Sequence, residues 1–453
     1  MRPGVAILGG GPAGLATAWA LEELKTSYVV LEAADTPGGN ARTIRHGEFL
    51  FDTGPHRFHD RDPEATRKIV GLLGEELQEV EAPSRILWRG RVLDFPLRPL
   101  QAVSAGGFGW SLLAGLDLLR ARAGGPASAT LDFGSWARSR FGRRIAEAFL
   151  IPFSEKLWGL PAAELSPEIA GRRLPGFGLF ELLRELVRTA RRSNHLEGRF
   201  LYPRGGYGRI VDAMAAKLAP GSLLCRTPVR RVMHFGGRVT GVEVELDGVR
   251  RRIEASAFVN TLPITLLLRM LDPAPPDQIF AAASRLRFRD CLLVALFLDQ
   301  SSVGEAACLY FSERELEFTR AHEPRNRSRA MSPEGKTSLV VEFPCFASDP
   351  LWSRPDEQLV DGLIDRLEGY HLIRRDRVLG QRVVRLRNAY PIYSLDYQTH
   401  AEIVLDYLRG FANLTTLGRG GGYFYGHVHD FVSEGFAAAE RAAELAPAER
   451  ASA

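Results

Sequence analysis

A glycine-rich turn near the N-terminus constrains the fold of this 453-residue chain more than any other feature. The segment "ILGGGPAGL" places Gly9, Gly11 and Gly14 between the apolar run "VAIL" at 5–8 and a helical pattern that begins at Pro12. Glycines at this spacing allow a tight turn, let a pyrophosphate approach the backbone, and pack the helix against the strand. We therefore expect a strand–turn–helix unit that binds a dinucleotide.

The next segments indicate which dinucleotide this unit binds. The run "YVVLE" reads as a second strand and ends in Glu32, whose carboxylate can accept hydrogen bonds from the ribose hydroxyls of an adenosine. The following segment "TPGGNART" at 36–43 contains a second glycine turn, Gly38-Gly39, and then Arg42. This turn resembles the corresponding motif of FAD enzymes in the amine oxidase and glutathione-reductase-like superfamily. We expect FAD, bound without a covalent bond because 412–435 contains no cysteine.

Composition narrows the class of protein further. No run of 18 apolar residues is present, which argues against an integral membrane segment, and the first residues read as a buried strand rather than a cleavable signal. The four cysteines lie far apart, as expected for reduced thiols in a cytoplasmic protein. A net charge of +4 is small for this length and does not favour a nucleic-acid partner. The oligomeric state is left open.

Strand and helix patterns interleave along the chain, and the segment 84–97 reads as a hairpin around Arg89-Gly90. We expect an α/β fold in which a Rossmann-type FAD-binding domain is assembled from discontinuous segments, with a helical insertion and a mixed-sheet substrate domain. The expected ranges are 1–83, 200–270 and 385–450 for the FAD-binding domain, 98–199 for the helical substrate domain, and 84–97 with 271–384 for the sheet-rich substrate domain.

Four further motifs carry a resemblance to a known family. They are "DTGPHRFHD" (52–60), "IPFSEKLWGLPAAEL" (151–165), "YPRGGYGRIVDAMA" (202–215) and "GRGGGYFYGHVH" (418–429). In this order they resemble UDP-galactopyranose mutase and its flavoprotein relatives, often labelled protoporphyrinogen-oxidase-like. The resemblance spans nearly the full chain and implies an FAD flavoenzyme with a small-molecule substrate.

The resemblance also implies roles for individual residues. His59 would lie against the isoalloxazine ring, Trp158 in the substrate cleft, and Arg419 and Tyr425 near the substrate phosphate and the flavin. Further phosphate-binding candidates are Arg289 and either Arg172 or Arg173, between which the sequence does not choose. The candidate cofactor-binding residues are Gly9, Gly11, Pro12, Ala13, Gly14, Glu32, Ala33, Gly38, Gly39, Asn40, Ala41, Arg42, Gly54, Pro55, His56, Val229, Gly418, Arg419 and Val428.

Several of these residues also have structural interpretations. His56 and His59 can be a structural pair in a polar turn, Trp158 can belong to the core, and the tyrosines of "AYPIYSLDY" (389–397) can pack the sheet or line the cleft. His427 and His429 lack an accompanying cluster of ligands, so we expect no metal. We expect Gly420–Gly422 to bring backbone onto the flavin, and a helix that begins at Asp430 to point its N-terminus at the ring.

The reaction stays open at this stage. One hypothesis is hydride transfer from the substrate to the flavin, which NAD(P) or oxygen then re-oxidises; the other is a non-redox isomerase of the mutase type, with reduced flavin as nucleophile. NAD(P)H is the candidate reductant of the flavin. An amine or porphyrinogen-type oxidase is a further alternative, although no lysine clearly matches the one on which amine oxidases commonly rely. Phe153 and Gly426-His427 depart from the mutase pattern. We expect a flavoenzyme acting on a nucleotide- or lipid-linked sugar or a related polar metabolite.

Overall fold

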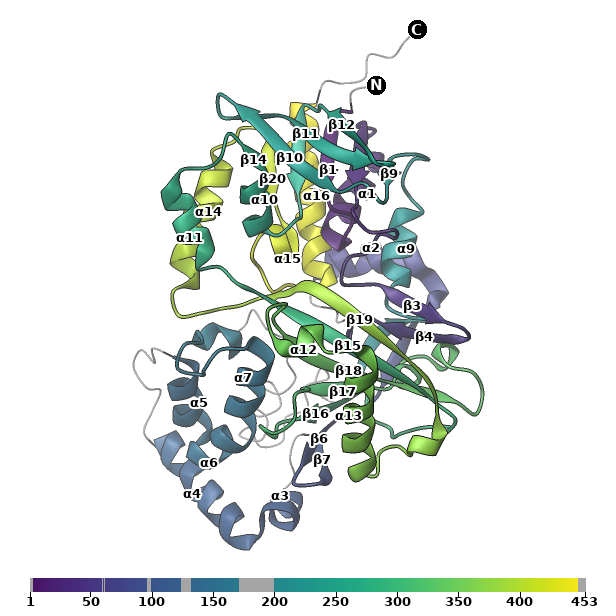
Figure 1. Ribbon diagram of the computed structural model, residues 1–453, viewed down its shortest axis with the longest axis vertical. Coiled ribbons are helices and arrows are strands. Elements are labelled where there is room, and N and C mark those ends of the chain that lie inside the picture. Colours follow the sequence, from purple (N-terminus) through teal and green to yellow (C-terminus); the bar gives the residue numbers. More distant parts are fainter. Residues whose placement is uncertain are drawn as a thin grey trace.

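The computed structural model describes residues 3–58, 60, 62–95, 99–123, 132–170 and 199–446. It has the expected α/β fold, with a parallel sheet and its helices at one end of the molecule (Figure 1). At the other end, a group of short helices lies beside a seven-stranded mixed sheet. None of the helices in these ranges is long and apolar enough to cross a membrane.

The parallel sheet has five strands in the order β20-β13-β1-β2-β9. They are β1 (Val5–Leu8), β2 (Tyr28–Leu31), β9 (Leu223–Leu224), β13 (Ala257–Asn260) and β20 (Leu414–Thr416). The central strand β1 is fully buried and pairs with both β2 and β13, which explains why its sequence is a continuous apolar run. Three widely separated parts of the chain therefore build one sheet.

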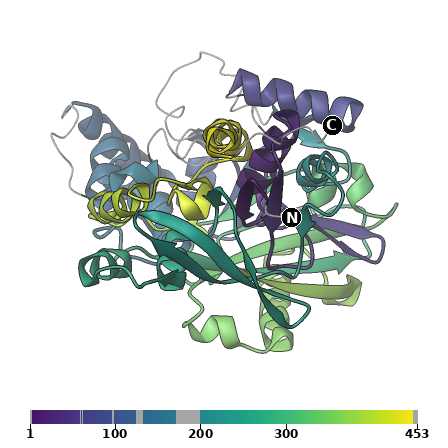
Figure 2. The ribbon, with the colours of Figure 1, turned by 90° about the horizontal axis from the view of Figure 1, so that it is seen from above.

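Helices cover this parallel sheet. They are α1 (Pro12–Glu23), α2 (Pro63–Leu73), α9 (Arg209–Ala215), α10 (Ile264–Met270), α11 (Asp277–Ser284), α14 (Tyr397–Arg409), the short α15 (Gly418–Gly421) and α16 (Val428–Leu445). Seen from above, α16 lies beside α1 (Figure 2). The two helices approach closely at Gly435, where an added Cβ would lie 2.7 Å from the Cβ of Ala16.

Helix α16 begins at Val428, two residues before the start expected from the sequence. His427 is the N-cap, and its backbone N–H donates to the side chain of Asp430 at 2.7 Å. Asp430 is therefore the third residue of the helix, where its carboxylate completes a capping box. The expectation that the helix begins at Asp430 was wrong because the acidic residue caps the turn from inside.

The mixed sheet has the strand order β19-β15-β18-β17-β16-β6-β7. Its strands are β6 (Ser84–Trp88), β7 (Arg91–Phe95), β15 (Phe288–Leu298), β16 (Cys308–Phe311), β17 (Arg320–His322), β18 (Thr337–Cys345) and β19 (Val378–Pro391). The expected hairpin is present as β6 and β7, with Arg89 and Gly90 in the turn at φ values of 51° and 71°. Two consecutive positive φ values are typical of the type I′ turn that suits a two-residue hairpin.

The remaining elements support these two sheets. Smaller sheets contain β3 (Thr43–His46) with β4 (Phe49–Asp52), β5 (Leu77–Glu81) with β8 (Arg199–Pro203), and β10 (Val229–Phe235), β11 (Arg238–Leu246), β12 (Val249–Ile253) and β14 (Leu271–Asp272). Helices α12 (Pro350–Ser353) and α13 (Asp356–Gly369) accompany the mixed sheet, and the helical group contains α3 (Pro99–Gly106), α4 (Phe108–Ala123), α5 (Phe133–Phe141), α6 (Arg143–Ile145) and α7 (Ile151–Trp158). The expected domain boundaries stay predictions.

Lys156 fixes α7 to the mixed sheet. Its ammonium group donates to the backbone carbonyls of Phe311 and Glu313 at 2.8 Å and of Phe318 at 3.0 Å. Burial lowers the pKa of Lys156 to about 7, since a charged ammonium is costly away from water. These three bonds hold the end of α7, and with it Trp158, at a fixed place beside the sheet.

Candidate active site

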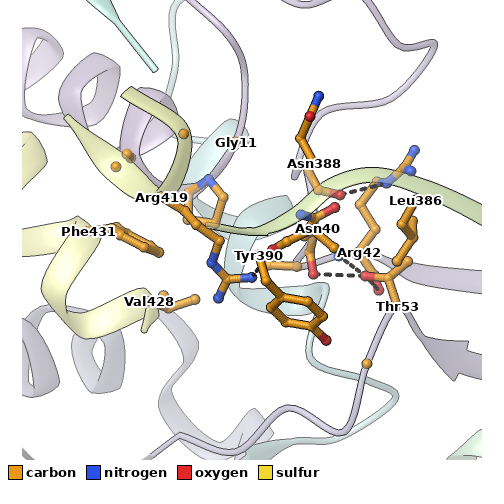
Figure 3. Close-up of a pocket in the computed structure, with 18 of the residues that line it drawn as sticks. Gly11, Asn40, Arg42, Thr53, Leu386, Asn388, Tyr390, Arg419, Val428 and Phe431 are labelled. Carbon is orange, nitrogen blue, oxygen red and sulfur yellow. Dashed lines mark hydrogen bonds between the residues drawn. The ribbon is translucent and has the colours of Figure 1, made fainter. Parts of the chain in front are cut away.

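A cavity of about 550 Å³ runs between the parallel sheet and the mixed sheet (Figure 3). Most of the candidate cofactor residues line it: Gly9, Gly11, Pro12, Ala13, Glu32, Ala33, Gly39, Asn40, Ala41, Arg42, Gly54, Pro55, His56, Gly418, Arg419 and Val428. Of the candidate catalytic residues, Arg419 and Tyr425 line the cavity. The structure therefore brings together, around one space, motifs that lie hundreds of residues apart in the sequence.

The first glycine turn forms one wall of the cavity. Gly9 has a φ of +106°, and a Cβ on Gly14 would lie only 2.0 Å from the carbonyl oxygen of Gly9. Gly11 differs, because the nearest atom to an added Cβ there is 4.0 Å away, on Gly39. Gly9 and Gly14 therefore shape the turn, whereas Gly11 leaves open space in the cavity beside the N-terminus of α1, which carries no acidic residue in its first turn. Such a helix end favours an anion.

Glu32 stands at the end of β2 with both carboxylate oxygens engaged. Its Oε2 accepts from the backbone N–H of Gly10 at 2.7 Å, and its Oε1 accepts from that of Ala34 at 2.8 Å. These bonds fix the side chain against the cavity wall. A carboxylate oxygen has more than one lone pair, so Glu32 can also accept from ribose hydroxyls.

The second glycine turn faces the first. Gly39 lies against Gly11, and the side chain of Arg42 donates through Nε to the carbonyl of Gly39 at 2.9 Å. Thr53 also fixes the loop of this second turn, because its hydroxyl donates to the carbonyl of Asn40 at 2.9 Å. The sequence reasoning did not single out Thr53, which lines the same cavity (Figure 3).

These walls fit an extended dinucleotide. Side chains at Gly11 or Gly39 would fill the space between the two turns, so glycine at these positions keeps a channel open for a ligand. A helix N-terminus, Arg42 and Glu32 then offer partners of the right kind for a diphosphate and a ribose. The channel continues past Arg42 toward His56, Tyr390 and Tyr425, which leaves room for the ring system of FAD.

The far end of the cavity is aromatic. Tyr390 and Tyr425 stack with their ring centroids 5.6 Å apart, and Trp158 packs behind them, 5.9 Å from Tyr425 and 6.5 Å from Tyr390. Trp158 is 2% exposed and does not itself line the cavity. Trp158 thus belongs to the core and supports the two tyrosines that face the cavity.

Arg419 lies next to Tyr390, with its guanidinium carbon 5.8 Å from the centroid of that ring (Figure 3). Its guanidinium carbon is 5.1 Å from the centroid of Tyr425, and its two Nη atoms donate to the carbonyls of Ala389 at 3.2 Å and Gly426 at 3.0 Å. Arg419 therefore ties β19 to the loop before α16 while one face of the guanidinium borders the cavity. Its position is compatible with contact to a bound ligand and is fixed in advance by the backbone.

The glycines that follow Arg419 serve close packing as well as access. A Cβ on Gly420 would lie 2.8 Å from the backbone nitrogen of Pro263, and one on Gly421 would lie 2.7 Å from the carbonyl of Asn260. Gly418 and Gly420 line the cavity, whereas Gly421 and Gly422 do not. The expectation that all of Gly420–Gly422 face the flavin therefore gives way to two roles, because α15 must also fit against the segment after β13.

Several candidates lie elsewhere. Arg289 does not line the cavity; its guanidinium donates to the carbonyls of Lys156 at 3.2 Å, Leu157 at 3.3 Å and Pro344 at 2.9 Å, so it closes the C-terminal end of α7. Gly14 and Gly38 support the two turns from outside the lining, and Val229 begins β10, also outside it. His59, Arg172 and Arg173 lie outside the residues that the structure describes.

An arginine that the sequence reasoning missed lines the cavity beside Tyr390. Arg320 is 6% exposed, forms a salt bridge with the fully buried Glu342, and donates to the hydroxyl of Tyr390 at 3.0 Å. Arg320 and Glu342 are directly opposite each other in the ladder between β17 and β18. The available signal was Glu342, a single charge within the apolar run "LVVEF" of β18, but the sequence does not say that Arg320 on β17 is its partner.

His56 lies in the cavity wall between the two ends. Its ring stacks on Tyr207 with centroids 4.8 Å apart. Burial, and then the positive charges of Arg419 and Arg327, lower the pKa of His56 to about 3. The imidazole is therefore neutral at physiological pH and can act as a hydrogen-bond partner, although not as a resident cation.

Asp52 fixes the backbone of Tyr207 by a hydrogen bond. Its side chain accepts from the hydroxyl of Thr43 at 2.6 Å, from the backbone N–H of Tyr207 at 3.0 Å, and from the hydroxyl of Tyr202. Burial raises the pKa of this carboxyl despite those bonds. Both carboxylate oxygens of Asp52 therefore have hydrogen-bond donors, and these bonds connect Tyr207, on whose ring His56 stacks, to Thr43 and Tyr202.

Comparisons with solved structures agree with this architecture. The fold matches a crystal structure of reduced UDP-galactopyranose mutase with a TM-score of 0.83 and 21% identity, covering 98% of this chain and 95% of that one. It also matches a putative protoporphyrinogen oxidase from Exiguobacterium sp. 255-15 with a TM-score of 0.75 and 19% identity, covering 96% and 97%. At these identities the likeness shows a shared fold.

Sequence relatives extend the comparison. Coproporphyrinogen III oxidase of Propionibacterium freudenreichii is 25% identical over 88% of this chain and 83% of that protein. Chloroplastic protoporphyrinogen oxidase 1 of Spinacia oleracea is 30% identical, but the match spans 37% of this chain and only 31% of the plant protein. The model of the flavin containing amine oxidoreductase family matches residues 12–444. The glycine turns, the channel and this match agree, and the chain belongs to the flavin-containing amine oxidoreductase family, whose cofactor is FAD.

Proposed function

We propose that this flavoenzyme acts on an anionic small molecule, namely a nucleotide- or lipid-linked sugar or a related polar metabolite. One observation carries the proposal: beyond the dinucleotide channel, the cavity is lined by Arg57, Arg320 and Arg419 next to two tyrosines. Arginine recognises phosphate and carboxylate through a fork of donors. A substrate with such a group, and a body that stacks on tyrosine, fits this end of the cavity.

The residues of the chain divide the work between holding and positioning. Bound FAD would supply the hydride acceptor. The glycine turns and α1 would hold its diphosphate, while Glu32 would hold the ribose. Tyr390 and Tyr425 form an apolar wall that positions the substrate and excludes water, and Arg320 places a positive charge there that Glu342 keeps in position. Neutral His56 offers a hydrogen-bond partner between the two ligands.

A second candidate is a non-redox isomerase of the mutase type, which would use reduced flavin as nucleophile. The arginine-rich end favours it, because several guanidinium groups can hold the diphosphate of a nucleotide sugar. A porphyrinogen-type oxidase is the further alternative, favoured by the match to coproporphyrinogen III oxidase over most of both chains. The first candidate needs NAD(P) or oxygen to re-oxidise the flavin, whereas NAD(P)H is the proposed reductant for the isomerase, which requires reduced flavin.

One anaerobic experiment separates these candidates. The FAD-loaded protein is mixed with a nucleotide sugar, a primary amine or a porphyrinogen while the flavin absorbance is recorded. Bleaching on addition of substrate indicates an oxidoreductase and identifies its substrate class. Conversion of the nucleotide sugar only after dithionite reduction, with no acceptor consumed, indicates the isomerase. If no compound bleaches the flavin or is converted, the proposed substrate classes are wrong.

A variant of Arg419 tests the anionic substrate separately. Arg419→Lys keeps the positive charge and loses the fork, so UDP should bind more weakly by about 1–3 kcal/mol while FAD content stays normal. Titration of the FAD-loaded protein with UDP measures this change. If flavin is lost instead, Arg419 serves the cofactor or its loop. If the wild type does not bind UDP at millimolar concentration, the nucleotide-sugar interpretation is wrong.

A further inference from the structure

Helix α4 exposes an apolar side that the proposed reaction does not use. Five of its large apolar side chains are exposed, whereas no other helix or strand in the described part of the chain carries more than one. Phe108 is 73% exposed and Leu119 is 60% exposed. The five side chains are those of Phe108, Leu112, Leu113, Leu116 and Leu119. Contiguous apolar patches on a protein surface mark contacts with another protein or a membrane, so this side of α4 calls for a partner.

The exposed side chains of α4 share one side of the helix. With about 100° between successive residues, Phe108, Leu112 and Leu119 project within about 40° of one another. The other side of the helix is packed: Trp110 lies on Trp88 of β6, with the ring centroids 4.8 Å apart. Helix α4 therefore turns an apolar side to the solvent, where a surface helix of a globular protein usually carries polar and charged residues.

Contacts on the packed side fix α4 in this orientation. Asp117 of α4 forms a salt bridge with Arg144 of α6 at 2.7 Å. At the other end of the helix, a Cβ on Gly106 would lie 2.7 Å from a ring atom of Trp110 and 3.0 Å from one of Trp88. The apolar side is thus exposed on a helix whose opposite side is closely packed.

The exposed charges beside the apolar side are positive. Arg120 is exposed and directly follows Leu119. At the other end of α4, the exposed Arg89 and Arg91 donate to backbone carbonyls of α3 at 3.4 Å and 2.8 Å. In the described part of the chain, no carboxylate lies within salt-bridge distance of these three guanidinium groups. Arginines therefore flank the apolar side at both ends.

The carboxylates near this surface do not offset those arginines. Residues 99–116 contain no charged residue. Asp117 is paired with Arg144, and Asp94, which accepts from the side chain of Gln101 on α3, is paired with Arg85 at 2.8 Å. The surface formed by the apolar side of α4 and its flanking arginines is therefore apolar and cationic, and an anionic partner complements it.

We propose that α4 lies flat on a membrane that contains anionic lipids, with its apolar side between the headgroups and the acyl chains. An interfacial helix combines such an apolar side with flanking cations, and acidic headgroups attract those cations. Helices α3 and α4 form the end of the molecule opposite the two termini, so a flat surface can reach them (Figure 1).

A second copy of the chain complements this surface less well than an anionic membrane does. A symmetric contact places the same patch on both partners, so it would bring the arginines of two copies together. Helix α4 has no unpaired carboxylate to compensate them, since Asp117 is paired with Arg144. The membrane proposal does not depend on which reaction the flavin cavity performs.

The test uses the full-length FAD-loaded protein and vesicles of phosphatidylglycerol and phosphatidylcholine. The protein should float with these vesicles in a density gradient, and much less with vesicles of phosphatidylcholine alone. Leu112→Glu should weaken binding to the mixed vesicles about tenfold or more, because a charge replaces a leucine that the membrane would bury. The matched control is Phe235→Glu, since Phe235 is 83% exposed on β10, at the other end of the molecule; this variant should bind as the wild type does (Figure 1).

A second variant separates the electrostatic contribution. Arg120→Gln should weaken binding to the mixed vesicles about fivefold, because one cation near an anionic surface is lost. Added salt should weaken the binding of the wild type, since it screens exposed charges. If Leu112→Glu loses its flavin or its circular dichroism spectrum, Leu116→Glu takes its place in the test.

Three outcomes overturn the proposal. The first is a wild type that does not float with the mixed vesicles. The second is a Phe235→Glu variant that loses as much binding as Leu112→Glu. The third is a dimer in size-exclusion chromatography with light scattering that Leu112→Glu converts to a monomer without any vesicle binding, which would assign the apolar side to a second copy of the chain.

Discussion

The two ends of the flavin cavity are built on different physical principles. The nucleotide end consists mainly of backbone and glycine from residues 5–42, with one carboxylate, Glu32, that its own loop holds in place. The opposite end consists of side chains from six or more separate segments, and its buried charge, that of Arg320, is compensated by Glu342. Binding at the first end therefore depends on space, whereas the second end depends on charge balance.

The largest expected effect comes from a substitution that fills the open space at the nucleotide end. Gly11→Val should abolish FAD binding, because its side chain would occupy the channel between the two glycine turns. The protein itself has room there, so the apo variant should still fold. Flavin content after purification and the far-UV circular dichroism spectrum measure the two outcomes.

Gly14→Ala is the matched comparison for that substitution. Its Cβ would lie 2.0 Å from the carbonyl of Gly9, so this variant should lose both FAD and folding stability. The comparison of the two ends fails if Gly11→Val retains stoichiometric flavin, or if the two variants lose stability equally.

The second prediction concerns the opposite end of the cavity, where a substitution removes the negative charge that balances Arg320. Glu342→Gln should lower the free energy of unfolding by about 3–5 kcal/mol, because it leaves the buried Arg320 guanidinium without its carboxylate. Urea denaturation of the FAD-loaded protein measures the loss. Glu317→Gln is the control, since Glu317 pairs with Arg354 at the surface and its removal should cost about 0–1 kcal/mol. Equal losses in both variants would mean that burial does not set the cost.

The third prediction concerns the pH dependence of folding stability, and the expected change per pH unit is smaller than the loss expected for Glu342→Gln. The folded-state pKa of His56 is about 3, below its value in an unfolded chain, so the unfolded state binds an extra proton between about pH 6.5 and pH 3. Stability should therefore fall as the pH falls through this window, by up to about 1.4 kcal/mol per pH unit for this group. Denaturant titrations at several pH values measure the slope.

Variants assign that slope to its residue. His56→Gln should reduce the slope, because a glutamine does not titrate. His371→Asn, at an exposed position with a φ of 57° that asparagine tolerates, should leave it unchanged. A wild-type slope that survives in His56→Gln would assign the effect to other groups, His322 among them.

The sequence predicts the nucleotide end well because its parts are neighbours in the chain. The spacing of Gly9, Gly11 and Gly14 directly encodes the turn, and Glu32 follows one strand later. The Arg320–Glu342 pair depends instead on the register between β17 and β18, which local patterns do not reveal. Arg289 shows the same limit: it was itself a candidate for phosphate binding, but the structure places it on the unpaired carbonyls at the end of α7.

The sequence predicts the aromatic wall of Tyr390 and Tyr425 less well than the nucleotide end, but better than the Arg320–Glu342 pair. The three tyrosines of "AYPIYSLDY" left open whether they pack or line a cleft, and the structure divides them: Tyr390 lines the cavity, while Tyr393 and Tyr397 stack on each other at 4.1 Å in the core. Spacing alone does not separate these roles, because β19 ends at Pro391, between the first tyrosine and the other two.

The packing of α16 on α1 has a consequence for how the protein is made. The first glycine turn leaves the ribosome early, but strand β20 and helix α16, which complete the sheet and press against Ala13 and Ala16, come from residues 414–445. A nascent chain that holds only the first turn has neither Gly418 nor Arg419 to close the cavity. The FAD cavity therefore reaches its final shape only after most of the chain has been translated. We expect FAD to bind late, to a chain whose other sheets have already formed.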